Sequence, residues 1–239
     1  KDGRRTQELR SLNASLGILP HTDGSAIFEL GNTKVLATVH GPREAKSSRC
    51  LHDRASIKVI FHTATFSSVS GERRRQLKQD KRLGEMTNAL EETFKEVIMV
   101  STFPRSEIDI FVEVLNADGG ILSAAFNAAM LALINAGIPM IDYLVAVNVG
   151  HIQGQPLLDL NRLEEASNNP SITVAFLPRS GTVSFLGLEP RLESDKLQPC
   201  MELAKMGITK LWTILDTQVV RPYITELCKF SKVTLQGAA

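Results

Sequence analysis

The chain has 239 residues, of which 43% are hydrophobic and 22% are charged. This composition is typical of a globular protein and excludes a disordered, collagen-like or low-complexity chain. The 27 Lys and Arg residues are balanced by 26 Asp and Glu residues, so binding to a polyanion must come from a local basic patch and not from the net charge of +1.

The first part of the chain predicts a β-hairpin and a further strand. Residues 25–30 and 33–40 are β-leaning runs separated by a Gly-Asn pair, a spacing that suits a tight hairpin turn. The Gly-Pro dipeptide at 41–42 is expected to end the second run. Residues 55–64 alternate between apolar and polar side chains, which predicts a strand with one buried face. Residues 67–82 lose this pattern and predict a loop.

The middle of the chain predicts two helices around a strand. Between residues 80 and 100 the apolar positions lie three and four apart, which is the stripe of an amphipathic helix. Residues 106–116 alternate strictly and predict a strand. Residues 118–136 predict a helix that is apolar nearly all round and is closed by Gly137. Such a helix is expected to lie at the centre of the core, where its alanines let a neighbouring element approach closely.

The last part of the chain predicts a second group of strands and a long helix. Four strands are expected, at residues 144–150, 157–160, 171–177 and 182–188. The helix has its apolar stripe between residues 201 and 219, and we expect Pro222 to break it. The order of strands and helices predicts an α+β protein built from mixed α/β layers.

The cysteines and the apolar runs bear on the cellular compartment. Cys50, Cys200 and Cys228 are odd in number and far apart, which predicts neither a disulfide framework nor a zinc site. No apolar run reaches the roughly 18 residues of a membrane span. The polar, Arg-rich start lacks the apolar core of a secretory signal. We expect a soluble intracellular protein with no membrane partner.

A basic segment between residues 72 and 82 is the first candidate functional feature. Six Lys and Arg residues face only Glu72 and Asp80 there, as in a footprint for a nucleic-acid backbone. A solvated loop without a ligand has about equal weight, although a basic segment before it favours the first interpretation. Few aromatic residues accompany the cations, so base stacking and sequence preference would be weak. The candidate nucleic-acid-contacting residues are Lys46, Arg73, Arg74, Arg75, Lys81 and Arg82.

A pair of glycines opens the apolar helix and is the second candidate. Free N–H groups at a helix start, approachable because glycine has no Cβ, form an anion site of phosphate size. Phosphate chemistry would add a cation in the first turn, and no cation is present there. On the sequence alone, a glycine-assisted helix start capped by Asp118 is the stronger interpretation. The degenerate phosphate site would consist of Gly119, Gly120, Leu122 and Ser123.

A group of acidic residues is the third candidate. Asp159, Glu164 and Glu165 follow a predicted strand, and two converging carboxylates there would hold Mg²⁺ or serve as acid and base. Alternatively, Asn161 followed three residues later by Glu164 forms a capping box for a short helix, and this structural interpretation is slightly favoured. The five histidines show no metal-ligand spacing, so we expect no metal site.

Short motifs over nearly the whole chain resemble the ribonuclease PH family and occur in the family's order. They are DGRR at 2–5, DGSA at 23–26, GNTKV at 31–35, GPRE at 41–44, ADGG at 117–120, NAGIPM at 135–140 and DLN at 159–161. Within the family, the chain is most similar to a ring subunit of the eukaryotic RNA exosome, the counterpart of the catalytic ring subunit in archaea. The resemblance implies a ribonuclease PH fold of two α/β portions, residues 2–140 and 141–230, the first like domain 2 of ribosomal protein S5.

The resemblance also implies a chemistry and a reason for its loss. In active members, orthophosphate attacks the 3′-terminal phosphodiester and releases a nucleoside diphosphate. Arg82 matches an arginine that contacts RNA or phosphate in active members. Asp159 matches their first acidic catalytic residue. Glu165 stands at the position of their second acidic catalytic residue, which is an aspartate in active relatives. Active members usually carry Thr-Arg after the glycine pair, where this chain has Ile121-Leu122. Losing a charge-assisted phosphate contact costs about 1.5 to 3 kcal/mol of binding, so we expect phosphorolysis to be lost and both carboxylates to be vestigial.

From the resemblance we expect a non-catalytic exosome ring subunit that binds single-stranded RNA in a central channel and supports 3′-to-5′ processing and decay, including rRNA processing. Its expected partners are other ribonuclease PH-like ring subunits, S1/KH-type cap subunits and a hydrolytic exonuclease that receives the RNA. The expected location is the nucleus, nucleolus and cytoplasm, and no cofactor is expected. Two alternatives stay open: an active phosphate-dependent 3′-to-5′ exoribonuclease that uses Mg²⁺, and an architectural subunit whose basic loop meets only protein.

Overall fold

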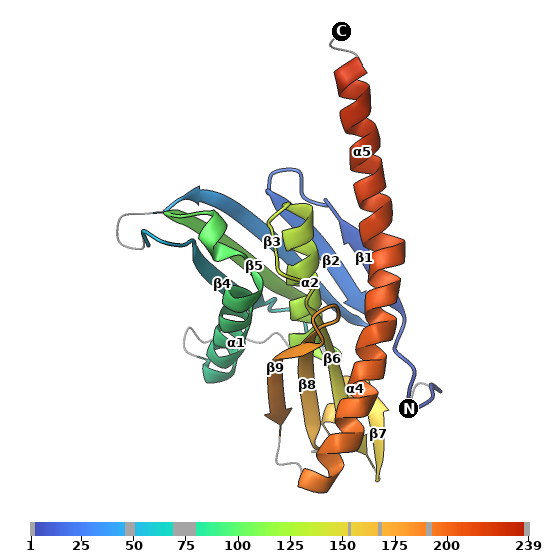
Figure 1. The fold of residues 1–239 in the computed structure, drawn as a ribbon. Coiled ribbons are helices and arrows are strands. Elements are labelled where there is room, and N and C mark those ends of the chain that lie inside the picture. Colours follow the sequence, from blue (N-terminus) through green and yellow to red (C-terminus); the bar gives the residue numbers. More distant parts are fainter. Residues whose placement is uncertain are drawn as a thin grey trace.

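The computed structural model describes residues 3–45, 51–68, 80–152, 154–166, 169–189 and 193–236. These residues form a five-stranded sheet with the order β1-β2-β3-β5-β4 and a four-stranded sheet with the order β7-β6-β8-β9. Each sheet carries helices, and the helix α2, Ile121–Asn135, contacts both sheets (Figure 1). The predicted α+β fold with two α/β portions is confirmed.

The five-stranded sheet comes from the first half of the chain. Its strands are β1 Leu12–Leu16, β2 Gly24–Leu30, β3 Thr33–Glu44, β4 Ser56–Thr63 and β5 Ser106–Asn116. All neighbours are antiparallel except β4 and β5, which are parallel and are connected through the helix α1, Lys81–Val97, and a short 3-10 turn at Val100–Thr102. The hairpin, the third strand and the strand at 106–116 are confirmed. The sequence does not predict β1, because five residues are too few to give a clear period.

The prediction that the Gly-Pro dipeptide ends the second strand is wrong. Strand β3 continues through Gly41 and Pro42 to Glu44, and its register against β5 shifts between His40 and Arg43. Proline cannot donate a hydrogen bond to a neighbouring strand, and such residues are tolerated at irregularities of this kind. The Gly41 N–H donates to the Asp23 carboxylate at 2.8 Å. The strand therefore passes the proline by a local change of register.

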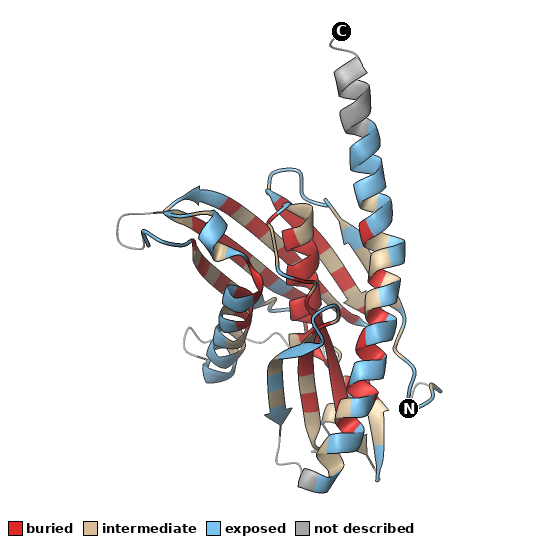
Figure 2. Ribbon diagram, viewed as in Figure 1, coloured by how far each residue is buried: buried red, intermediate tan, exposed pale blue. Residues whose placement is uncertain are grey.

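The helix α2 is the centre of the core, as its sequence predicts. Every residue from Ser123 to Leu133 is buried, and the helix is the continuous buried element between the two sheets in Figure 2. Its alanines allow strand β2 to approach so closely that a Cβ on Gly24 would lie 2.3 Å from the Ala132 carbonyl oxygen. This packing holds the last turns of α2 against strand β2 of the first sheet.

The four-stranded sheet comes from the second half of the chain. Its strands are β6 Val145–Ile152, β7 Gln155–Leu158, β8 Ser171–Leu177 and β9 Thr182–Glu189, and all pairings are antiparallel. A one-turn helix, α3 Arg162–Glu165, lies between β7 and β8. The helix α4, Ser194–Leu215, packs against β6, β7 and β8. The edge strand β9 carries exposed apolar side chains, which are Val183, Leu186 and Leu188.

The prediction that the last helix breaks at Pro222 is wrong. Helix α4 already begins at Ser194, before Pro199, and it continues through a π-helical segment, Asp216–Val220, into α5, Arg221–Gln236. The three form one rod that extends beyond the body of the molecule (Figure 1). A proline clashes with the i−4 carbonyl of a regular helix, and the wider π turn directly before Pro222 changes that register. The rod bypasses the proline for this reason.

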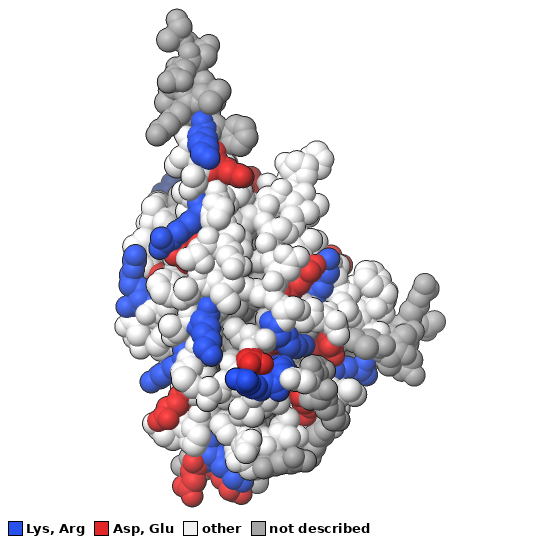
Figure 3. Space-filling view, turned by 90° about the vertical axis from the view of Figure 1, so that its right-hand side faces the viewer, with Lys and Arg blue, Asp and Glu red and all other residues white. Residues whose placement is uncertain are grey.

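Two surface properties follow from the described residues. In those ranges, no helix combines the length and the apolar character needed to cross a bilayer. The face seen in Figure 3 carries Lys and Arg interspersed with Asp and Glu over its described residues. The near-neutral net charge of the sequence is thus spread as a mixture of both signs on that face.

Candidate functional site

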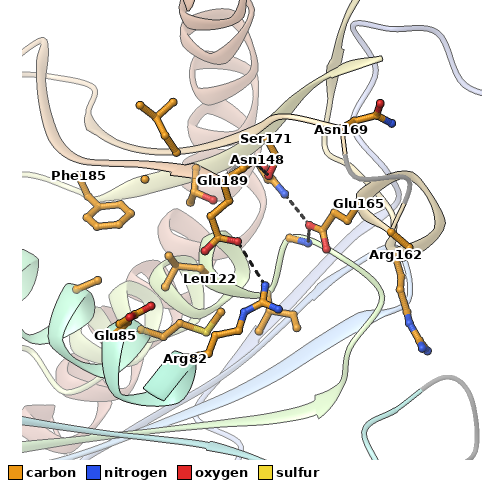
Figure 4. Close-up of a pocket in the computed structure, with 18 residues that line it drawn as sticks. Arg82, Glu85, Leu122, Asn148, Arg162, Glu165, Asn169, Ser171, Phe185 and Glu189 are labelled. Carbon is orange, nitrogen blue, oxygen red and sulfur yellow. Dashed lines mark hydrogen bonds and ion pairs between the residues drawn. The ribbon is translucent and has the colours of Figure 1, made fainter. Parts of the chain in front are cut away.

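A cavity of about 670 Å³ lies between the two sheet-bearing halves (Figure 4). The start of α1 and the first turn of α2 form one side, and β6, α3, β8 and β9 form the other. Some of the residues that line the cavity are candidate site residues from the sequence analysis, and others are not. The lining residues that matter most here are Arg82, Leu122, Asn148, Glu165, Phe185 and Glu189.

The glycine pair directly precedes the first turn of α2, and Gly120 lines the cavity. Gly119 and Gly120 have φ angles of +82° and +59°, which side chains other than glycine rarely adopt. A Cβ on Gly119 would also lie 2.4 Å from the Leu160 carbonyl oxygen. The predicted cap at Asp118 is wrong: the cap position is Gly120, and the Asp118 carboxylate instead accepts a 2.9 Å hydrogen bond from the Asn32 amide.

A carboxylate from the other half of the chain serves this helix start. Glu165 Oε1 accepts hydrogen bonds from the Gly120 N–H and from Asn148 Nδ2, both at 2.8 Å. Helix N-termini favour negative charge because their N–H groups are unsatisfied. Burial raises the pKa of Glu165 above its usual range, although the Gly120 hydrogen bond and the charge of Arg82 oppose this shift. The protein thus supplies its own anion where the sequence suggests a phosphate-sized site.

Some of the predicted phosphate-site residues line the cavity, and others do not. Gly120 and Leu122 line the cavity, so an aliphatic side chain stands in the first turn of α2. Ser123 is fully buried, and its hydroxyl donates to the Gly120 carbonyl oxygen at 2.9 Å. Gly119 supports the turn but does not line the cavity. Only two of the four predicted residues are therefore in reach of a ligand.

Asp159 lies outside the cavity and is paired with an arginine. Its carboxylate is fully buried and contacts the Arg10 guanidinium through Nε at 2.8 Å and Nη2 at 2.7 Å, and it accepts from the Arg10 backbone N–H at 3.1 Å. The Arg4 guanidinium donates to the Asp159 backbone oxygen. These bonds attach the N-terminal segment to the end of β7. Both carboxylate oxygens of Asp159 are thus engaged by Arg10, and Asp159 is not among the residues that line the cavity.

The short helix α3 has the predicted capping box. The Asn161 side chain accepts from the Glu164 N–H, and the Glu164 carboxylate accepts from the Asn161 N–H, both at 2.9 Å. Glu164 is further bonded to Arg4 at 2.6 Å. Of the three acidic residues considered from the sequence, Glu165 is the one that lines the cavity. Within the described ranges, no group of three or more His, Cys, Asp and Glu side chains is placed to hold a metal ion.

The described cations of the basic segment lie at the start of α1. Asp80 caps this helix by accepting from the Arg82 N–H at 3.2 Å. The Arg82 side chain lines the cavity, where its guanidinium lies 3.5 Å from the Glu189 carboxylate, and both side chains are about two-thirds exposed. Lys81 is exposed beside it. The other candidate RNA-contacting residues, Lys46, Arg73, Arg74 and Arg75, lie outside the described residues.

Sequence reasoning missed several residues of the cavity. Asn148, Phe185 and Glu189 come from β6 and β9, which have no recognisable motif. Asn148 had one available signal, because it is a single amide within the apolar run at 145–150, and buried polar groups require partners. Arg10 was also missed, since its partner Asp159 is 149 positions away and no local pattern relates the two.

Comparisons with known proteins agree with the fold. Residues 8–139 match the model "3′ exoribonuclease family, domain 1", and residues 142–207 match "3′ exoribonuclease family, domain 2". The chain is 44% identical over 227 residues to the human exosome complex component RRP41, covering 94% of this chain and 91% of that protein. It is 38% identical over 241 residues to the exosome complex component Rrp41 of Archaeoglobus fulgidus, and this match covers 99% of this chain and 92% of that protein. The crystal structure of rice Rrp46 superposes with a TM-score of 0.82 at 25% identity, covering 90% of this chain and 97% of that one.

Proposed function

The chain belongs to the 3′ exoribonuclease family, the ribonuclease PH family, and we propose that it is an RNA exosome ring subunit that binds RNA without performing phosphorolysis. Its relatives support the exosome assignment, because they include exosome complex components that align with nearly the whole chain. The observation that carries the loss of phosphorolysis is the chemistry at the start of α2. There, Leu122 stands in the first turn, where orthophosphate requires positive charge.

The electrostatics of the cavity oppose an inorganic phosphate. The Gly120 N–H is already bonded to Glu165, and Leu122 offers neither charge nor a hydrogen-bond donor. The described lining residues carry three carboxylates and two guanidinium groups, and the guanidinium of Arg82 is next to Glu189. A dianion placed beside Glu165 would be repelled at short range, and this repulsion is strongest where water is excluded.

The proposed RNA contacts are at the start of α1. Lys81 and Arg82 are exposed there, and the positive end of the helix adds to their charge. We assign Lys46 and the Arg73–Arg75 run to the same RNA path on their sequence alone. The proposed partners are single-stranded RNA, other ribonuclease PH-like ring subunits, S1/KH-type cap subunits and a hydrolytic exonuclease. The proposed location is the nucleus, nucleolus and cytoplasm, where such a complex would process rRNA and degrade RNA.

An active phosphorolytic exoribonuclease is the second candidate function, and Glu165 favours it because this carboxylate is retained in the cavity. That function would use Mg²⁺ held by paired carboxylates. The donor set does not fit such an ion, because the Asp159 carboxylate is bonded to Arg10 and, among the residues that the structure describes, no group of three or more His, Cys, Asp and Glu side chains is placed to hold a metal. We therefore place the active enzyme second.

The phosphate-dependent assay separates the two functions. The assembled ring, without its hydrolytic exonuclease, is incubated with end-labelled RNA and orthophosphate, and the products are resolved. We expect no nucleoside diphosphate. Its release by the unaltered ring would contradict the proposed loss of phosphorolysis.

A double variant tests the reason for the loss. Ile121→Thr with Leu122→Arg places a hydroxyl and a guanidinium in the first turn of α2, and charge-assisted contacts worth about 1.5 to 3 kcal/mol predict phosphate binding roughly 10- to 150-fold tighter. Leu122→Met is the control, since it keeps the volume and adds no charge. Phosphate affinity is measured by NMR titration, and equal affinities for both variants would contradict the electrostatic argument.

Charge reversal tests the RNA contacts. We expect Lys81→Glu with Arg82→Glu to slow the decay of long single-stranded RNA by the complete complex, because both cations lie at the proposed entry to the ring subunit. Lys95→Glu, at the exposed end of the same helix, is the matched control. Decay rates that are unchanged in the double variant would contradict the assignment of these residues to RNA.

A further inference from the structure

The cavity contains a buried acceptor without a partner. Asn148 is 3% exposed and lines the cavity, and its Oδ1 atom has no hydrogen-bond partner among the described residues. The orientation of this amide is determined by its neighbour: Nδ2 donates to Glu165 Oε1 at 2.8 Å, whereas a reversed amide would direct two acceptors at each other. A buried acceptor in this state calls for a donor from outside the described residues, which an ordered water or a ligand supplies.

The groups around Asn148 do not supply that donor. Glu85, Glu165 and Glu189 contribute acceptors to the lining. Figure 4 shows Arg162 extending away from Glu165 and Asn148, and Arg82 directed toward Glu189. The inner end of the cavity therefore combines a carboxylate with a buried amide oxygen that has no partner among the described residues, and it favours a cation that carries several N–H groups.

The walls of the cavity add an apolar requirement. Leu122 from α2, Phe185 from β9 and Met86 from α1 line the space that leads to Glu165. A ligand with an aliphatic stem and a charged head would pack the stem against these side chains and bring the head to the acceptors. The volume of about 670 Å³ also leaves room for residues that flank such a side chain in a peptide.

We propose that this cavity binds an arginine side chain of a protein partner, with Glu165 and Asn148 Oδ1 accepting hydrogen bonds from its guanidinium. Arginine fits better than lysine, because its planar fork presents several donors at once to a carboxylate and a neighbouring oxygen. A protein side chain fits better than the 3′ end of an RNA, because RNA would bring phosphates next to Glu85, Glu165 and Glu189. The inference rests on the proposed loss of phosphate binding and adds a new ligand class for the same cavity.

The test uses arginine blocked at both ends as the probe and NMR of the isotope-labelled full chain as the readout. The signals followed are the Asn148 side-chain amide and the Gly120 backbone amide. We expect saturable shifts with blocked arginine and at least about tenfold weaker binding for blocked citrulline, which has nearly the same shape without the charge. Absence of a saturable shift, or equal affinities for the two probes, would overturn the proposal.

A pair of variants tests whether Glu165 binds the arginine side chain. Glu165→Gln keeps an acceptor for Gly120 and removes the charge, and we expect it to weaken arginine binding by about tenfold or more. Glu91→Gln is the control, because Glu91 pairs with Lys95 on α1 and does not line the cavity. Unchanged binding in Glu165→Gln would overturn the proposal, and the citrulline comparison tests it even if that variant does not fold.

Two further probes separate this inference from the proposed function. If inorganic phosphate binds tightly and shifts the Gly120 amide signal, the proposed loss of phosphate binding is wrong. The response to blocked arginine tests the arginine site independently of that result. If guanosine 5′-monophosphate binds at Asn148 and Glu165 more tightly than blocked arginine, the occupant is RNA and the proposal is overturned. Binding of blocked arginine without a response to phosphate would support both the arginine site and the proposed loss of phosphate binding.

Discussion

Asp159 and Glu165 are six positions apart in the sequence, yet their side chains do different work. Asp159 is fully buried against Arg10 and joins the N-terminal segment to the end of β7. Glu165 reaches the cavity and bonds to the start of α2. Their chemistry is set by their partners: the Asp159 carboxylate is bonded directly to the Arg10 guanidinium, whereas the Glu165 carboxylate is desolvated and bonded to two neutral N–H donors, with Arg82 and Arg10 acting on it only through their charge. We therefore expect the two residues to respond differently to mutation.

The Glu165→Gln variant is expected to gain stability relative to the unaltered protein as the pH rises. Burial raises the pKa of Glu165 in the folded state, so its stabilising contribution is complete below the unfolded pKa of about 4.3 and is lost as the pH rises through the folded pKa. Glutamine does not ionise and still accepts from Gly120. Thermal unfolding midpoints of both proteins at about pH 4 and about pH 7.5 test this. A difference between the two proteins that is the same at both pH values would contradict the prediction.

The Asp159→Asn variant is expected to lose about 3 to 5 kcal/mol of unfolding free energy, because it leaves the Arg10 cation buried without a counter-charge. Asparagine has the same shape and tolerates the φ of +58° at this position, so the loss reports the charge. Urea denaturation measures it. Glu29→Gln is the control: Glu29 pairs with Lys34 at a more exposed site, where about 1 kcal/mol or less is expected. Equal losses in both variants would show that burial of the pair has no effect.

At the scale of elements, the start of α2 depends on close backbone approach. Gly119 brings this helix against the loop that precedes α3, which places Gly120 within hydrogen-bond distance of Glu165. The two segments come from different halves of the chain. The cavity is therefore organised by the packing of α2 against the second sheet and less by any single side chain.

The Gly119→Ala variant tests this contact. Its Cβ would lie 2.4 Å from the Leu160 carbonyl oxygen at a φ of +82°, whereas a Cβ on Gly137, with a φ of +70°, meets nothing within 4 Å. We expect Gly137→Ala to lose about 1 to 2 kcal/mol from the backbone angle, and Gly119→Ala to lose about 2 to 5 kcal/mol because overpacking is added. Chemical denaturation compares them. If the two variants lose the same free energy, the close approach has no energetic weight.

At the scale of the whole molecule, strand β9 is the element that a ring would cover. It forms one edge of the second sheet, and Val183, Leu186 and Leu188 are 43 to 49% exposed. Exposed apolar side chains on an unpaired strand edge favour association. Because the proposed function is a ring subunit, we expect this edge to be buried by a neighbouring subunit.

The Leu186→Lys variant is therefore expected to enter the assembled complex less efficiently while its own unfolding midpoint stays nearly unchanged. Leu19→Lys is the control, since Leu19 is 38% exposed in the turn between β1 and β2. Native mass spectrometry of the reconstituted complex measures incorporation of each variant. Incorporation of Leu186→Lys equal to that of Leu19→Lys would contradict the assignment of β9 to an interface.

Much of the fold is predictable from short stretches of sequence. The alternation of Ile108, Ile110 and Val112 predicts β5, and the apolar composition of 118–136 predicts a central helix, because both signals depend on neighbours a few positions away. Two signals fail where the backbone adjusts locally, at Pro42 by a shift of strand register and at Pro222 by a π-helical segment. A local rule does not include such adjustments, which are stabilised by the surrounding packing.

The candidate functional site is likewise only partly predictable from the sequence. The sequence by itself determined the glycine start of α2, the aliphatic Leu122 after it, the capping box of α3 and the basic start of α1. The tertiary structure alone decided that Asp159 is held by Arg10, that Glu165 replaces Asp118 as the anion at the helix start, and that Asn148 lies beside it. The physical reason is distance along the chain: these hydrogen bonds and ion pairs join residues 17 to 149 positions apart and exist only after the chain has packed into its tertiary structure.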